Sequence, residues 1–311
     1  MKEAYFEVTR NAIDRVTETF DLVHPITISV WNMKSEIAGI KEVYPAITES
    51  QLNGIYNYAS VVHGVNYKKN FLELSWEEFQ KKLAWLLLSN LFAIYEGWLA
   101  ELKRACFKNM DIKNMQFPTT GTNEGVYNEI NKLTATSSFV TSACFYNKYK
   151  RKKHYSTVSL DNLIYCYRYF KELRNCYIHN GIRASQQLCK AYQAFLPYNS
   201  ATGLGIKGSL EIYKPILGKV CNVSLRGVIG FSEIILNLLV TCDAELLKAK
   251  KGEDYLLKQL KKVHTQIRCL NGDPDKAKKQ AGRICVKAGF VMPDDLGTMK
   301  QYLLNNHIVS P

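Results

Sequence analysis

The sequence lacks the features that mark secreted and membrane-spanning proteins. No uncharged apolar run reaches the roughly 18 residues that a membrane span needs, because Ser232, Glu233 and Asn237 interrupt the best candidate, residues 228–240. The N-terminal stretch MKEAYFEVTRNAIDR has charges scattered through it and no apolar centre like that of a signal peptide. We therefore expect a cytoplasmic protein that does not act at a membrane.

Cysteine and histidine patterns typical of disulfide-rich or zinc-binding proteins are also missing. The nine cysteines are irregularly spaced without a C-x-x-C pair, and the six histidines include no H-E-x-x-H motif. Scattered cysteines in odd number are typical of reduced, mostly buried thiols in a cytosolic protein. The stretch GLGIKG at 203–208 lacks the sequence context of a phosphate-binding loop. The sequence therefore predicts no metal site and no cofactor.

Acidic residues are few relative to basic ones. The chain of 311 residues has 28 Asp and Glu against 41 Lys and Arg, which gives a net charge of +13. Such an excess favours polyanions, nucleic acid first and an anionic membrane surface second, although a basic protein can also be merely soluble. The hydrophobic fraction of 47% excludes a disordered chain. The length fits two domains, or one large domain with an extension.

Apolar residues recur at helical spacing through most of the chain, which predicts a mainly α fold. The first helix is expected over residues 3–23, with His24-Pro25 as its end. The piece ITISVW at 26–31 then alternates apolar and polar residues, so we expect a short strand or a loop there.

Two further helices are predicted from their first residues. Thr48 and Ser75 are each followed three residues later by Gln or Glu, the pattern of a capping box. The helix after Thr48 is expected over 48–62. The helix after Ser75 is apolar almost all round between residues 83 and 102, which is typical of a helix in the middle of a core.

The centre of the chain alternates between polar and helical stretches. Residues 108–138 are rich in Asn, Thr, Gly and Ser, so we expect an insertion with one short helix near 124–133. A long helix is predicted over 160–179, capped by Ser159 and stopped by Gly181.

The last part of the chain changes character twice. Residues 209–224 suggest a small β-hairpin with Pro215 and Gly218 at its turn, and a long helix is expected from 225 to 248. The strongly basic stretch that follows predicts three short helices. We therefore predict a helical-bundle domain over 1–249 and a short basic helical extension over 250–311.

The end of the helix 160–179 carries polar residues that a plain helix does not need. Arg174 continues the apolar stripe of this helix, and arginine is rarely buried without a partner. Glu96 is similarly misplaced on the apolar face of the core helix. We predict that Arg174 and Glu96 meet, either directly or through Asn175. His179 lies at the helix C-terminus, where a cation is favoured.

This set of residues suits the cleavage of a phosphodiester. An RNA strand carries its own nucleophile, the 2′-OH, so cleavage needs a proton acceptor, a proton donor and positive charge at phosphorus, without an obligatory metal. Arg174 and His179 offer two positive donors to one phosphate. A histidine in this place is also an ordinary helix cap, and an Arg-x4-His pair on its own is a short motif.

The arrangement resembles the HEPN superfamily, the all-helical domains of prokaryotic defence and toxin ribonucleases. Its hallmark is an arginine, usually a polar residue, and a histidine after four to six intervening positions, late in a long helix. Here Arg174, Asn175 and His179 match that pattern, and Glu96 in LFAIYEGWL is similar to a glutamate of an earlier helix in several HEPN families. The resemblance covers roughly residues 60–248.

The resemblance implies a metal-independent endoribonuclease in a toxin or anti-phage defence context. The RNA 2′-OH would attack the adjacent phosphate and leave a 2′,3′-cyclic phosphate. By this analogy His179 is the acid or base, Arg174 the phosphate clamp and Asn175 a positioning group, while Glu96 orients Arg174. HEPN domains usually dimerise, which implies a homodimer, with an antitoxin or defence protein as a possible partner.

A run of basic and aromatic residues before the helix 160–179 suggests where RNA would lie. Basic residues track phosphates and aromatic rings stack on bases, although a solvated helix end has a similar composition. Arg183, just past the motif, is expected to join this surface. The candidate RNA-binding residues are Lys148, Tyr149, Lys150, Arg151, Lys152, Lys153, Tyr155 and Arg183.

Other interpretations stay open from sequence. Cys176 and His179, three residues apart, could form a thiol–imidazole pair, although no third group accompanies them. The basic extension could bind RNA, form a small helix-turn-helix unit or simply pack on the bundle. The main alternative to a ribonuclease is a non-catalytic HEPN-like module that binds RNA, a nucleotide or a protein.

Overall fold

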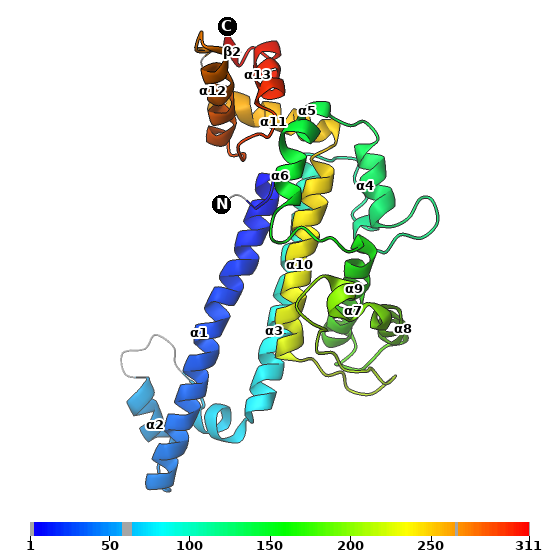
Figure 1. Ribbon diagram of the computed structural model, residues 1–311. Helices are drawn as coiled ribbons and strands as arrows, with labels where there is room; N and C mark the ends of the chain where they lie inside the picture. Colours follow the sequence, from blue (N-terminus) through cyan, green and yellow to red (C-terminus); the bar gives the residue numbers. More distant parts are fainter. Residues whose placement is uncertain (1–2, 58–63, 265–266, 311) are drawn as a thin grey trace.

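The computed structural model describes residues 3–57, 64–264 and 267–310, and these residues form the predicted mainly helical fold. Figure 1 shows α3 and α10 side by side, with α1 along one side of them and α7 on the other. These four long helices are α1 (Glu7–Val43), α3 (Trp76–Ala105), α7 (Leu160–His179) and α10 (Leu225–Leu246).

Shorter elements surround this frame. The short helices are α2 (Glu49–Tyr56), α4 (Val126–Thr134), α5 (Phe139–Thr141), α6 (Asn147–Lys150), α8 (Gln186–Phe195), α9 (Ala201–Leu204), α11 (Lys250–Val263), α12 (Pro274–Lys287) and α13 (Leu296–Asn305). Single π or 3-10 turns are η1 (Lys68–Glu73), η2 (Asn114–Gln116), η3 (Ser142–Tyr146) and η4 (Leu196–Tyr198). Two short parallel strands, β1 (Arg268–Cys269) and β2 (Val309–Ser310), pair near the C-terminus.

Aromatic side chains join three of the long helices. The ring of Phe231 on α10 lies 4.4 Å from Phe170 on α7 and 5.5 Å from Phe92 on α3, measured between centroids. Phe170 is 1% exposed and the other two rings are fully buried, and buried aromatic pairs of this kind contribute about 0.5–1.5 kcal/mol each beyond their buried area. This packing sets the position of α7 against α3.

The prediction that the first helix ends at His24-Pro25 is wrong, because α1 continues to Val43 and includes residues 26–31. Proline removes one N–H donor from a helix and costs about 3 kcal/mol there. Tertiary contacts support the helix beyond it. Lys34 donates to the carbonyls of Phe71 (2.7 Å) and Leu74 (2.6 Å), and Ile37 is fully buried.

The predicted helix starts are confirmed. Thr48 and Ser75 both form complete capping boxes, and Ser159 accepts a hydrogen bond from the backbone of Asp161. The short helix expected inside 108–138 is α4, and the last long helix is α10. The helix after Thr48 ends at Tyr56, and residues 58–62 of its predicted range lie outside the described residues.

The predicted β-hairpin at 209–224 is wrong, since the segment forms no strand. Its backbone binds other parts of the chain. Cys221 donates to the carbonyl of Ile182 (2.7 Å) and Ala184 donates to the carbonyl of Lys219 (2.9 Å), while Leu210 donates to the side chain of Asn199 (2.7 Å). The predicted turn at Gly218 does form, with φ of 74°. The segment therefore packs against the chain that follows α7.

Two helices, α3 and α10, are long and apolar enough to cross a membrane by length and composition alone. Within their most apolar windows, 56% and 67% of the residues are buried inside the protein. The core helix of a folded domain gives the same signal, and both helices occupy the centre of this core.

The basic extension forms the three predicted helices, α11, α12 and α13. Its residues share one hydrophobic core with the bundle. The ring of Phe290 lies 5.0 Å from Tyr5 and 5.7 Å from Phe145. The extension thus packs against the residues just before α1 and against η3.

Candidate functional site

The end of α7 is fixed by an unusual turn. Gly181 has φ of 56°, as its role as a helix stop predicts, and Ile182 follows with φ of 64°. A branched residue in the left-handed region is strained. The carbonyl of Ile182 accepts a hydrogen bond from Cys221 (2.7 Å), and the N–H of Ile182 donates to Cys176 (3.0 Å). These two hydrogen bonds hold the strained turn in place directly after the end of α7.

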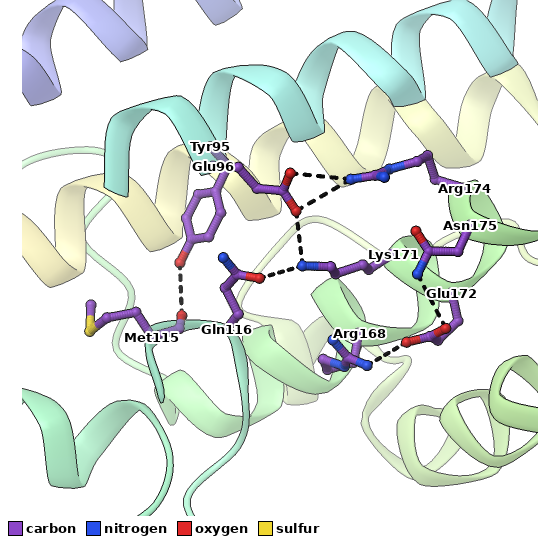
Figure 2. Close-up of polar contacts among 9 residues, drawn as sticks. All are labelled: Tyr95, Glu96, Met115, Gln116, Arg168, Lys171, Glu172, Arg174 and Asn175. Atoms are coloured by element: carbon purple, nitrogen blue, oxygen red, sulfur yellow. Dashed lines mark hydrogen bonds and ion pairs between the residues drawn. The ribbon is translucent and has the colours of Figure 1, made fainter. Parts of the chain in front are cut away.

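The predicted meeting of Arg174 and Glu96 is confirmed (Figure 2). One guanidinium nitrogen of Arg174 donates to both carboxylate oxygens of Glu96, at 3.3 and 3.2 Å. The guanidinium also lies over the ring of Phe92, 5.2 Å from its centroid. The contact is direct, so Asn175 does not bridge the pair.

Glu96 holds a second cation that sequence reasoning missed. The ammonium of Lys171 lies 2.9 Å from a carboxylate oxygen of Glu96 and also donates to Gln116 in η2. Lys171 precedes Arg174 by three positions, so both share one face of α7. That spacing is the only feature of the sequence that indicates the contact between Lys171 and Glu96. No feature of the sequence indicates the contact between Lys171 and Gln116.

Asn175 belongs to a different polar row on α7. Its amide donates to Glu172 (3.4 Å), which also accepts from Arg168. The guanidinium of Arg168 lies 4.0 Å from the ring centroid of Phe117. Figure 2 shows this row beside the Glu96 cluster, to which α7 contributes Lys171 and Arg174.

His179 is exposed at the last position of α7. It lies five positions after Arg174, and at about 100° per residue the two side chains leave the helix about 140° apart. Arg174 faces α3, whereas His179 lies on the side that carries Asn175. Within the described part of the chain, the imidazole has no hydrogen-bond partner. One chain alone therefore does not bring the two cations together.

The basic run near residue 150 lies far from this site. Ser156 donates its backbone N–H to Thr241 (2.9 Å), and Tyr155 donates to Glu245 (2.9 Å), both near the C-terminal end of α10. Arg174 instead lies at the level of Phe92 and Phe231. From Phe231 to Glu245 the helix rises about 21 Å. One RNA strand could reach both places only by spanning that length.

Several predicted RNA contacts have other roles. Tyr149 is fully buried, so the prediction that it stacks on bases is wrong. Lys148 pairs with Asp294 at 2.9 Å, and Arg183 donates to the carbonyl of Gly218 at 3.0 Å. The remaining basic side chains of the run are exposed or half-buried: Lys150, Arg151, Lys152 and Lys153.

Cys176 is buried rather than paired with His179. Its thiol lies 3.5 Å from the hydroxyl of Ser185, beneath the loop that carries Cys221. The burial fits the reading of a structural thiol and gives no support to a thiol–imidazole nucleophile.

No family model, curated protein or solved structure matches this chain.

Replacing Glu96 with glutamine is expected to lower the free energy of unfolding by about 1–3 kcal/mol. The side chains of Arg174 and Lys171 are only 16% and 18% exposed, so both would lose their counter-charge in a poorly solvated place. Equilibrium urea unfolding measures the change. Glu77→Gln on the same helix is the control, because the Glu77–Lys81 pair lies at the surface and is worth about 0.5 kcal/mol or less. Equal losses would rule out an anchoring role for Glu96.

Proposed function

We propose that the protein is a metal-independent endoribonuclease that acts at the end of α7. The proposal rests on two groups of the same helix: the guanidinium of Arg174, which Glu96 holds in place, and the exposed imidazole of His179 five positions later. With one group supplied by each of two copies, they would act as a phosphate clamp and an acid–base group. The net charge of +13 supports a polyanionic substrate.

In the proposed reaction, a base takes the proton of a 2′-OH, and that oxygen attacks the adjacent phosphorus. The bond from phosphorus to the 5′-oxygen breaks, and an acid returns a proton to the leaving oxygen. The products are a 2′,3′-cyclic phosphate and a 5′-OH. His179 acts as acid or base, Arg174 neutralises charge on the phosphate, and Asn175 positions the strand.

We propose a homodimer as the active form. Because Arg174 and His179 leave α7 about 140° apart, the proposed reaction requires a second copy to place an imidazole opposite each guanidinium. We propose two such pairs facing one RNA strand, with His179 of one copy as base and that of the other as acid. The setting would be cytoplasmic, in toxin activity or anti-phage defence, with an antitoxin or defence protein as regulator.

A second candidate is a non-catalytic HEPN-like module that binds RNA, a nucleotide or a protein. One observation favours it: Arg174 already has an anionic partner in Glu96 and points away from His179. A helix that carries only a structural arginine would keep the ion pair without cleaving RNA.

Incubation of purified protein with total RNA in EDTA separates the two candidates. The ribonuclease proposal expects the RNA to be fragmented at protein concentrations where the chain is dimeric. RNA that is bound and left intact at those concentrations would favour the non-catalytic module. Growth arrest on expression of the wild type, absent with His179→Ala, would support cleavage in the cell.

A further inference from the structure

A second candidate site lies on the opposite part of the molecule from His179. A cavity of about 800 Å³ is lined by the end of α3, the end of α4 and the first turns of α11. Figure 1 shows α11 lying across the ends of α3 and α10, where the extension meets the bundle. We call this cavity the basic pocket.

Positive charge dominates the wall of the basic pocket. Five lysines line it, against one carboxylate, that of Asp254. Three of the lysines have an acidic partner, at 2.6 to 3.1 Å. Lys108 and Lys258 are exposed and form no ion pair with the residues that the structure describes. The five are Lys108, Lys132, Lys250, Lys251 and Lys258.

Two of these lysines lie where a helix disfavours them. Lys250 and Lys251 occupy the first turn of α11, at the positive end of its dipole. The residue before them, Ala249, supplies no side-chain cap. Glu253 and Asp254 pair with these two lysines, so a bound anion would add to a helix end that already attracts negative charge.

Part of the lining of the basic pocket is apolar, and we call this part its floor. Cys106, Phe107, Leu133 and Tyr255 contribute to its lining. Cys106, Leu133 and Tyr255 are partly exposed and offer apolar surface to a ligand, whereas Phe107, at 2% exposure, is already buried. A phosphate ion alone would leave the apolar surface of this floor exposed to water, whereas a ligand with a ring system would bury it.

We propose that the basic pocket binds a nucleoside polyphosphate, with the phosphates on the lysines and the base or sugar against the apolar floor. The volume lies within the range of about 300–1,000 Å³ common for sites that take small ligands. A single RNA strand is bound along an extended groove with exposed stacking rings, but here the lysines converge on one cavity. The site is independent of the proposed ribonuclease activity.

Isothermal titration calorimetry on the full chain tests the proposal. The probes are ATP, GTP, inorganic tripolyphosphate, adenosine and a ten-nucleotide single-stranded RNA. We expect ATP or GTP to bind at micromolar concentration, tripolyphosphate at least tenfold more weakly, and adenosine not measurably. The double variant Lys108→Ala/Lys258→Ala should weaken nucleotide binding at least tenfold.

Two further variants separate the pocket from general charge and from misfolding. Lys207→Ala/Lys287→Ala removes the same charge from exposed positions outside the pocket and should change binding less than twofold. Thr136→Trp fills the pocket from an exposed position and should abolish binding without changing the charge or the thermal unfolding midpoint.

Three results would overturn the proposal. The first is that the wild type binds no nucleotide, and the second is that tripolyphosphate binds as tightly as ATP. The third is that Lys207→Ala/Lys287→Ala loses as much affinity as Lys108→Ala/Lys258→Ala. Binding of the RNA alone, lost in Lys108→Ala/Lys258→Ala, would assign the pocket to a nucleic-acid strand instead.

Discussion

Replacing His179 with alanine is expected to reduce RNA cleavage by about 10²–10⁴-fold, the usual contribution of a general acid or base. The imidazole is exposed and holds nothing in place among the described residues, so the free energy of unfolding should change by less than about 0.5 kcal/mol. Cleavage of a labelled RNA under single-turnover conditions measures the first quantity, and urea unfolding measures the second.

His24→Ala supplies the matched control for this loss. His24 is another exposed imidazole on a long helix, α1, and its removal should leave cleavage unchanged. If the His179→Ala variant cleaves RNA at the rate of the wild type, the imidazole of His179 takes no part in the reaction. A loss of cleavage equal in both variants would point to a general effect of removing an imidazole and not to a role of His179 in the reaction.

Replacing Asp243 with alanine is expected to lower the free energy of unfolding by about 3–5 kcal/mol. This fully buried carboxylate on α10 accepts the backbone N–H groups of Tyr5 (2.6 Å) and Phe6 (3.1 Å), at the start of α1. Alanine would leave both donors buried without an acceptor. Asp243→Asn keeps one acceptor oxygen and should lose about half as much, and equal unfolding midpoints for the wild type and the alanine variant would refute the role.

The same carboxylate gives a pH dependence whose sign can be stated. Burial raises the pKa of Asp243 from 3.8 to about 6, outweighing the hydrogen bonds that lower it. Between these values the native state keeps a proton that the unfolded state has lost, so the contribution of Asp243 to stability falls as the pH rises from about 4 to 6. The free energy by which the wild type is more stable to unfolding than Asp243→Asn should therefore shrink by about 3 kcal/mol between pH 4 and pH 6. An advantage that is constant with pH would contradict the assignment.

Local signals predicted the frame of the fold and part of the site. Ser159 and Gly181 bound α7 as expected, because caps depend on neighbouring residues only. Arg174 and Glu96 could be paired from sequence, because each was a charge on an apolar face and needed a partner.

Long-range contacts decided what the sequence left open. Pro25 ends a helix in isolation, but Lys34 supports the continuation of α1 through the carbonyls of Phe71 and Leu74, 37 and 40 residues away, and Ile37 packs with Leu52 and Tyr67. The sequence of the segment 209–224 predicts a hairpin, but its backbone N–H groups donate to the carbonyl of Ile182 and to the side chain of Asn199. Tyr149 lies among lysines in sequence, and only tertiary packing places its ring in the core.

The basic pocket had no signal at all in the sequence. Its walls come from three stretches, near residues 105–109, 132–136 and 250–258, which the fold brings together. A lysine in any one of them is an ordinary surface residue, and the convergence exists only after α11 has packed across the end of α3.

The most direct test of the central claim is the chemistry of the cleaved strand. A short RNA that the protein cleaves would be compared, in EDTA, with the same sequence carrying 2′-O-methyl groups throughout. The account predicts fragments that end in a 2′,3′-cyclic phosphate and a 5′-OH from the first, and no cleavage of the second. Cleavage of the methylated strand, or fragments with a 5′-phosphate, would contradict attack by the 2′-OH at the end of α7.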